Sequence, residues 1–263
     1  MLVCASTACM EYLSVTEPSR QSITVSVVSH GQGQLVAALL EDLACCQNVS
    51  AVVLTQNIPE DDIPCPASLQ PRLRVISNEH PRGFAANHNR AFRFCETSMF
   101  AVLNPDIRLR GDPFPQLARA LEMSFVGLVA PAVRNPSGDL EDSARAFPTP
   151  LRLLRKLTGL GDGRILTESA TPQDVDWTAG MFLLFPASVY RELKGFDESF
   201  FLYYEDVDIC ARLWLSGRHV ILHPNVTVIH AAQRASRRKL RYLKWHLSSM
   251  LRYFVKHAWR LPR

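Results

Sequence analysis

The chain has 263 residues, of which 47% are hydrophobic and 21% charged, a composition typical of one large or two small globular domains. No run of 18 or more apolar residues occurs, which argues against a membrane-spanning helix, and the first twenty residues lack the basic start of a secretory signal peptide. The net charge of +4 is uneven, because residues 234–263 hold ten Lys or Arg and no acidic residue.

The seven cysteines include no CxxC pair, so neither a zinc site nor a disulfide framework is indicated, and a reducing cytoplasm is the expected compartment. We expect a poorly ordered leader over residues 1–21 and one domain over 22–233. A basic C-terminal segment over 234–263 follows.

Buried strands and helices alternate in the first half of the chain. Strands rich in β-branched residues are predicted at 22–30, 49–57, 72–77 and 99–106, and helices at 34–46 and 83–96. This alternation predicts an α/β fold with a mainly parallel sheet, in which ligands bind beyond the carboxyl ends of the strands. His30, Asn57 and Asp106 lie at such ends and are expected around one crevice.

The second half is less regular. Strands or a hairpin are predicted over 127–135 and 138–147, a Pro- and Gly-rich loop over 148–174, and a strand over 176–186 that leads into a short helix. The next helix begins at the acidic residues of "YYEDVD" and stops at Gly217. Two short strands over 219–230 and a helix from about 235 to about 259 complete the chain.

Two acidic motifs have alternative interpretations. Asp106 in "LNPD" could reach a divalent cation on a nucleotide diphosphate, or its side chain could close a turn. Glu205, Asp206 and Asp208 could stabilise the start of a helix, or line a cleft behind an aromatic rim. His230 beside apolar residues could be a ligand or a core side chain.

The succession of these motifs along the chain resembles that of family 2 glycosyltransferases. The resemblance is to the rhamnosyltransferase-like branch in particular, which builds surface polysaccharides. The resemblance extends from about residue 23 to about residue 257. It is most specific between residues 177 and 230, where W-x-x-G, G-F-D-E-x-F-F, E-D-x-D-x-x-x-R and P-x-x-x-x-x-H follow one another. The fold that it implies is a single A-type glycosyltransferase domain that binds a nucleotide-diphospho-sugar.

The resemblance also implies an activity and a site. The activity is inverting transfer of a sugar, for example a deoxyhexose such as rhamnose, to a hydroxyl of a lipid-linked or polysaccharide acceptor. Asp206 matches the catalytic base, and Asp106 with His230 matches the Mg²⁺ or Mn²⁺ site. The other matches, listed by side, are His30, Asn57, Gly83 and Asn89 toward the donor, and Trp177, Gly180 and Glu205 toward the acceptor.

Two positions depart from the family pattern and bear on which nucleotide and sugar are bound. The family often has Asp-Asn after the second strand, where this chain has Gln56-Asn57. It commonly has Asn two residues before the donor-side glycine, where this chain has Pro81.

The basic C-terminal segment carries an apolar stripe at Leu240, Leu243, Leu247, Leu251 and Phe254. The stripe could lie on an anionic membrane or pack onto the domain. From the family resemblance we expect an enzyme, and from the basic segment we expect it on the inner face of the cytoplasmic membrane. The alternatives are a non-catalytic, sugar-nucleotide-binding assembly subunit and a nucleic-acid-binding protein. The acidic body of the chain argues against nucleic acid as a partner.

Overall fold

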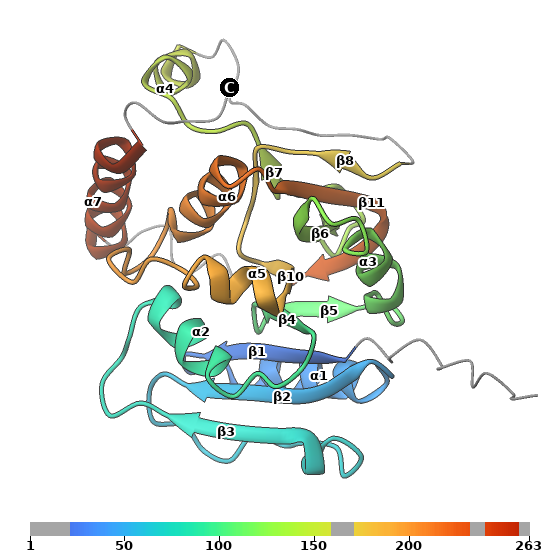
Figure 1. The fold of residues 1–263 in the computed structure, drawn as a ribbon. Coiled ribbons are helices and arrows are strands. Elements are labelled where there is room, and N and C mark those ends of the chain that lie inside the picture. The colour runs from blue at the N-terminus through green and yellow to red at the C-terminus, as the bar shows by residue number, and fades with distance from the viewer. Residues whose placement is uncertain (1–21, 159–170, 232–239, 258–263) are drawn as a thin grey trace, which may run out of the picture.

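A computed structural model describes residues 22–158, 171–231 and 240–257, and Figure 1 shows a central sheet with helices on both faces. The strands are β1 (Ile23–Ser29), β2 (Val49–Gln56), β3 (Leu73–Ser77), β4 (Met99–Leu103), β5 (Ile107–Leu109), β6 (Val126–Arg134), β7 (Ala144–Arg145), β8 (Gln173–Asp174), β9 (Trp177–Thr178), β10 (Phe182–Pro186) and β11 (His219–His230). The helices are α1 (Gly33–Ala44), α2 (Phe84–Phe92), α3 (Phe114–Ala120), α4 (Pro150–Leu157), α5 (Ala187–Glu192), α6 (Glu205–Leu215) and α7 (Leu240–His257), with a 3-10 turn at Gln70–Arg72.

The main sheet has the order β3-β2-β1-β4-β10-β6-β11-β5, and β8 pairs with β11. Strands β3, β2, β1 and β4 are parallel to one another, as are β6 and β11. Strand β10 runs antiparallel between β4 and β6, and β5 runs antiparallel to β11. The predicted α/β fold with a mainly parallel central sheet is therefore confirmed.

Two hydrophobic clusters cover the two faces of this sheet. Helices α1 and α3 contribute Leu39, Leu40 and Phe114 to one cluster. Helices α2, α5 and α6 supply the other, in which Tyr190 and Phe196 pack against Phe100 and Phe185 of the sheet. All five residues of β4 are buried, as expected for a central strand covered on both faces.

Several elements differ from the sequence-based predictions. Helix α4 lies within the predicted 148–174 loop, and only two residues of 138–147 form a strand, β7. The predicted 176–186 strand is divided into β9 and β10. The two strands expected over 219–230 form one strand, β11, whose register with β6 shifts between His223 and Thr227, where Pro224 cannot donate to the ladder. Strand β5 and helix α3 have no counterpart among the predicted elements.

The C-terminal helix extends over 240–257 within the described residues, whereas the prediction covers about 235 to about 259. The predicted leader over 1–21 lies outside the described residues. Among the helices that the structure describes, none has both the length and the apolarity needed to cross a bilayer.

Candidate active site

Asp106, His230 and Glu141 come together although they are far apart in the sequence. Strand β11 pairs His230 with Ile107 of β5, beside Asp106, and the Ala231 N–H donates to the Asp106 carbonyl. His230 Nε2 then lies 3.1 Å from Asp106 Oδ2, and His230 Nδ1 lies 2.7 Å from Glu141 Oε2. Glu141 reaches this place because the chain turns back after β6, the parallel neighbour of β11.

These contacts determine the charge of His230. Burial alone would lower the pKa of His230, but hydrogen bonds and charge from Asp106 and Glu141 outweigh it and raise the pKa to about 8. The imidazole is therefore mostly protonated at neutral pH. In the absence of a metal it is a cation held between two carboxylates.

Asp106 suits a divalent cation better than His230 does. Its second oxygen, Oδ1, is buried and has no hydrogen-bond partner within the described structure, so it could serve as one hard oxygen ligand. Both nitrogens of His230 already face carboxylates. Over the part of the chain that the structure describes, no group of three or more His, Cys, Asp or Glu is placed to hold a metal. Other ligands would have to come from diphosphate and water, which is common for Mg²⁺.

Asp206 opens α6 and contacts the segment between β9 and β10. Its Oδ2 accepts a hydrogen bond of 3.0 Å from the Gly180 N–H, and its Oδ1 accepts one of 2.8 Å from the Val207 N–H. The Asn104 N–H, in the loop that carries Asp106, donates to the carbonyl of Met181, next to Gly180. One short backbone segment thus links the loop of Asp106, the candidate metal ligand, with Asp206, the candidate base.

The three acids of the E-D-x-D motif have three different environments. Asp208 is fully buried, and its carboxylate contacts Arg212, Lys256 and His257. Burial alone would raise its pKa, but these hydrogen bonds and charges hold the pKa below its usual range. Asp208 is therefore a structural ion that joins α6 to α7.

Glu205 and Asp206 are an adjacent pair, of which Glu205 is buried and Asp206 is partly exposed. Burial and the charge of Asp206 raise the pKa of Glu205 well above its usual range, and one Glu205 oxygen, Oε2, has no partner within the described structure. Burial also raises the pKa of Asp206, but the N–H groups of Gly180 and Val207 oppose this. Both carboxyl groups therefore take up a proton more readily than an exposed carboxyl group does. The two N–H groups on Asp206 favour its ionised form relative to that of Glu205.

A cavity of about 220 Å³ lies in front of this pair. Its lining includes the two acids, the ring of Trp177 and the side chains of Arg145, Tyr203 and His246. Trp177 is fixed because its Nε1–H donates to the Ala146 carbonyl at 3.1 Å. A flat aromatic wall beside an ionised carboxylate is a surface on which a sugar ring can rest while one hydroxyl meets the base.

The aromatic loop before α6 has a strained backbone. Tyr203 and Tyr204 have φ values of 70° and 68°, a region that bulky residues rarely adopt. The loop is held by a hydrogen bond of 3.0 Å from the Phe84 N–H to the Phe201 carbonyl. A Cβ on Gly83 would lie 2.4 Å from that carbonyl oxygen, so glycine is needed for this close approach.

The remaining predicted donor-side residues fall into two groups. Asn57 lies 3.2 Å from His30 and bonds both the N–H and the carbonyl of Arg82, so the structure brings His30 and Asn57 together. Asn89 instead bonds Tyr190, Phe196 and Glu198, which occupies both ends of its side-chain amide. Asn89 thus holds the G-F-D-E loop in place.

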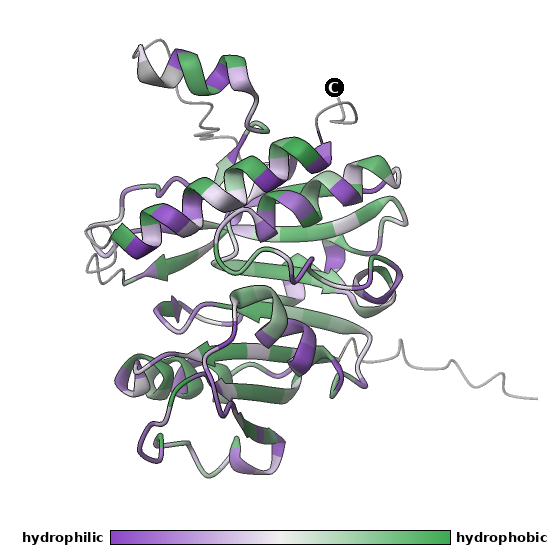
Figure 2. Cartoon of the chain, turned by 90° about the vertical axis from the view of Figure 1, so that its left-hand side faces the viewer, coloured by the Kyte–Doolittle hydropathy of each residue, from purple (hydrophilic) through white to green (hydrophobic). Residues whose placement is uncertain are grey.

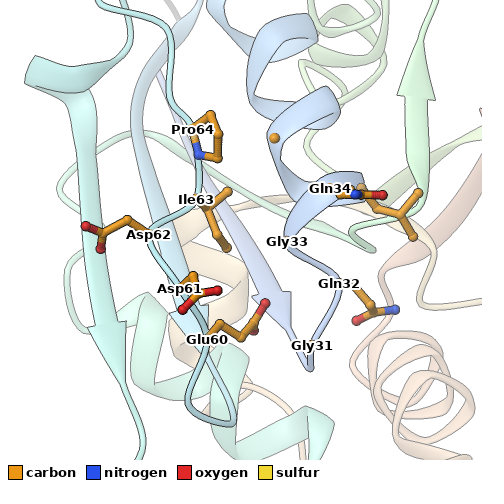
Figure 3. A pocket seen from close by; sticks show the side chains of 11 residues that line it. Gly31, Gln32, Gly33, Gln34, Glu60, Asp61, Asp62, Ile63 and Pro64 are labelled. Atoms are coloured by element: carbon orange, nitrogen blue, oxygen red, sulfur yellow. The ribbon is translucent and has the colours of Figure 1, made fainter.

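A larger cavity, of about 530 Å³, lies where α1 begins, beside Gly31 and Gly33 (Figure 3). Its opposite wall carries Glu60, Asp61 and Asp62, and Glu60 accepts a hydrogen bond of 2.8 Å from Ser29. Three carboxylates make this cavity a poor place for a diphosphate. Of the predicted site residues, none lines it.

Helix α7 packs onto the domain through a face other than the leucine stripe. Ser249, Tyr253 and His257 are buried, and Ser249 donates to the Leu202 carbonyl at 2.9 Å. The four leucines of the stripe remain exposed, and only Phe254 is partly buried. Of the two alternatives for the stripe, packing onto the domain holds for Phe254 and not for the leucines within the described structure. The helix contacts the domain mainly through other side chains, among them Ser249, Met250 and Tyr253.

Sequence reasoning missed several residues of the site, namely Glu141, Arg145, Arg152, Tyr203 and His246. Tyr203 belongs to the aromatic rim that precedes the acidic motif in the sequence, which is the one signal that could have found it. Glu141 and the basic residues stand in no recognisable local pattern, and only the tertiary fold brings them to the site.

Comparison with known proteins identifies relatives of this chain. It is 28% identical over 248 residues to rhamnosyltransferase WbbL of Escherichia coli, covering 89% of this chain and 93% of that protein. It is 30% identical over 175 residues to the N-acetylglucosaminyl-diphospho-decaprenol L-rhamnosyltransferase of Mycobacterium tuberculosis, covering 61% of this chain and 57% of that protein. No protein-family model matches.

Solved structures share the fold at low sequence identity. GalNAc-T7, crystallised with UDP, GalNAc and Mn²⁺, aligns with a TM-score of 0.68 at 12% identity, over 91% of this chain and 48% of that one. The mannosyltransferase PcManGT from Pyrobaculum calidifontis, crystallised with GDP-Man and Mn²⁺, aligns with a TM-score of 0.62 at 17% identity, over 92% of this chain and 65% of that one. These likenesses confirm the predicted A-type fold.

Proposed function

We propose, on the premise that this chain is a rhamnosyltransferase-like member of the family 2 glycosyltransferases, that it transfers a sugar from a nucleotide-diphosphate donor to an acceptor hydroxyl with inversion. The observation that carries the proposal is the division of labour in the E-D-x-D motif. Asp206 lines the cavity and accepts hydrogen bonds from two backbone N–H groups, Glu205 lines the cavity beside it, and Asp208 is buried against Arg212 and Lys256. A purely sugar-binding assembly subunit would not need a carboxylate oriented in this way.

In the proposed reaction Asp206 is the general base. The acceptor hydroxyl attacks the anomeric carbon from the face opposite the diphosphate, which inverts that carbon, while Asp206 takes the hydroxyl proton. The Gly180 N–H holds the carboxylate in place. The raised pKa of Glu205 favours its protonated form, which would donate a hydrogen bond to the acceptor and add no second negative charge beside Asp206.

On the donor side, Asp106 would hold Mg²⁺ or Mn²⁺ through its unpartnered oxygen. When bound, the cation would neutralise charge on the departing diphosphate. The His230 cation lies beside Asp106 and offsets the charge of Asp106 and Glu141, so the diphosphate does not meet two unbalanced carboxylates. The nucleotide is proposed to contact His30, Asn57 and the backbone around Gly83. Asn89 is proposed to support these residues indirectly, through the loop that it holds in place.

The acceptor is proposed to be lipid-linked. The mycobacterial relative is named for a diphospho-decaprenol substrate, and the cavity before Asp206 has aromatic and basic walls. A lipid-linked acceptor, together with the basic and partly apolar α7, supports a peripheral place on the cytoplasmic face of a membrane. Because the relatives are named rhamnosyltransferases, a deoxyhexose donor is the first choice.

The test is a transfer assay with purified protein, decaprenyl diphosphate-linked N-acetylglucosamine and a panel of nucleotide sugars, with and without Mn²⁺. Donors that bind are found beforehand from the rise in melting temperature that binding causes. Transfer with inversion supports the proposal. Donor binding without transfer or donor hydrolysis would favour the assembly-subunit alternative.

A further inference from the structure

Two helices with apolar and basic surfaces border the acceptor cavity. Helix α4 contributes Arg152 and Leu153 to its lining, and α7 contributes His246. Figure 2 shows α7 crossing the face turned toward the viewer, with α4 above it on the same side of the molecule. The cavity that holds Asp206 therefore lies between elements more than 80 residues apart in the sequence.

Both helices expose leucines that no packing within the described chain explains. On α4, Leu151 and Leu154 are 59% and 57% exposed. On α7, the four leucines of the stripe and the neighbouring Val255 are between 49% and 85% exposed. Clustered apolar side chains of this size on one side of a protein usually mark an interaction surface.

The charge beside these leucines has one sign. Neither helix contains an Asp or Glu, and both carry exposed arginine or lysine. These exposed basic residues are Arg152 and Arg155 on α4 and Arg241, Lys244 and Arg252 on α7, besides Lys256, which pairs with Asp197 and Asp208. Leucines next to basic residues, without acidic ones, match an anionic bilayer, whose headgroups attract the charges while the leucines enter the interface.

We propose that α4 and α7 together form one membrane-contacting surface. The cavity between them then receives the diphosphate of a polyprenyl diphosphate-linked acceptor directly from the bilayer. This inference rests on the proposed function and names the class of its acceptor. With both helices on the membrane, the cavity opens at the level of the headgroups, where the diphosphate of such a lipid lies. The polyprenyl chain stays in the bilayer, and the sugar extends toward Asp206.

Arg152 is the residue best placed to meet the diphosphate. It lines the cavity and is exposed, and one of its N–H groups donates to the Phe147 carbonyl at 2.7 Å. Its contact with Asp176 is loose, at 3.6 Å. A guanidinium has five N–H donors in a fork that fits phosphate, so donors remain for the ligand. Arg155, on the same helix, is exposed but does not line the cavity.

The membrane surface is tested by flotation with phosphatidylglycerol-containing vesicles. Leu151→Glu on α4 and Leu251→Glu on α7 should each lower the vesicle-bound fraction several-fold. The control is Val75→Glu on β3, where an equally exposed residue lies at the far end of the sheet from both helices, and it should leave binding unchanged. If Leu251→Glu alone reduces binding, or if all three variants bind alike, the two-helix surface is refuted.

The diphosphate site is tested with the same vesicles, prepared with and without decaprenyl diphosphate-linked N-acetylglucosamine. Arg152→Gln and Arg155→Gln each remove one charge from α4, so both should weaken binding to plain anionic vesicles to the same degree. Only Arg152→Gln should lose the added affinity for vesicles that contain the diphosphate lipid, and this loss should be about tenfold. Equal loss in both variants, or no added affinity in the unaltered protein, would overturn the inference.

Failure of this inference can be told apart from failure of the proposed function, because vesicle binding needs no sugar donor. Donor binding by the same preparations is measured separately by calorimetry. Intact donor binding and transfer, with equal lipid affinity in the two arginine variants, would refute the diphosphate site alone. Absence of transfer, with selective loss in Arg152→Gln, would refute the enzyme and leave the lipid site standing.

Discussion

Asp208 Oδ1 lies 2.8 Å from His257 Nε2, and this fully buried contact joins the third acid of the E-D-x-D motif to the end of the C-terminal helix. Lys256 reaches the same oxygen at 2.7 Å, and Arg212 binds the other oxygen at 2.8 Å. The motif thus serves two purposes: Asp206 faces the cavity, and Asp208 fixes α7 beside it.

Asp208→Ala should destabilise the protein by about 3 kcal/mol, because it removes a fully buried carboxylate that contacts Arg212, Lys256 and His257 and leaves these partners unsatisfied. The free energy of unfolding from urea titration is the measurement. Asp174→Ala is the control, since its pair with His219 is half exposed and its loss should cost less than about 1 kcal/mol. Equal losses in the two variants would show that Asp208 does not anchor α7.

Acid should loosen the attachment of α7. Burial alone would raise the pKa of Asp197, but hydrogen bonds from Lys256 and Ser199 lower it to about 2, and the pKa of Asp208 is also lowered. A carboxyl group whose pKa is lower in the folded protein stabilises it above the unfolded pKa of about 3.9, and this contribution is lost as the pH falls toward 2. Stability measured between pH 6 and pH 3 should fall toward the acid end.

The control for this pH dependence is Asp197→Asn, in which one of the two groups cannot titrate. Its stability should vary less steeply over the same interval than that of the unaltered protein. An identical slope would contradict the assignment of acid sensitivity to this ion-pair cluster.

Asp106→Ala should abolish metal-dependent donor binding, because the diphosphate would then lack the bridging cation. Calorimetry with Mn²⁺ and the identified donor is the measurement, and His230→Gln should weaken binding less. Asp61→Asn tests the acidic cavity at α1 and should leave donor affinity unchanged. Unaltered affinity of Asp106→Ala in Mn²⁺ would exclude Asp106 as the cation ligand.

Gly83→Ala should cost about 1–3 kcal/mol of stability and disturb the aromatic loop, because the added Cβ would collide with the backbone oxygen of Phe201. Gly33→Ala is the matched control. Gly33 begins α1, and a Cβ there would meet only ordinary contacts, the nearest being Ile63 at 3.5 Å, so the effect on stability should be small. Thermal unfolding of both variants distinguishes crowding from a general effect of losing glycine.

The alternation of β-branched strands with helices was enough to predict the parallel half of the sheet, because strands such as β1 and β4 are buried on both faces. The long-range contact of Glu141 with His230 could not be predicted, since it depends on the pairing of β6 with β11 and on a turn outside both strands. Helix α4 was missed because prolines and glycines around it outweighed its own helical pattern, although proline is favoured at a helix start.

The leucine stripe of α7 illustrates a second limit of prediction from the sequence. Helical periodicity identifies an apolar face but does not say what covers it. In this protein Ser249, Tyr253 and His257 form the inward face, and buried Asp208 is the counter-charge for its last turn. A hydrogen-bond contact between residues 49 positions apart, Asp208 and His257, fixes this face of the helix toward the domain, and no pattern local to α7 indicates it.

The most direct test of the proposed mechanism is the transfer rate of Asp206→Asn, measured with the true donor and acceptor alongside donor affinity. Asparagine preserves the size of the side chain but cannot take the hydroxyl proton, so the rate should fall by about 10²–10⁴ while donor affinity stays within a few-fold. Glu205→Gln preserves the shape of the side chain and its capacity to donate a hydrogen bond, and it should keep most of the activity. Near-normal transfer by Asp206→Asn, or a comparable collapse in Glu205→Gln alone, would contradict the assignment of Asp206 as the base.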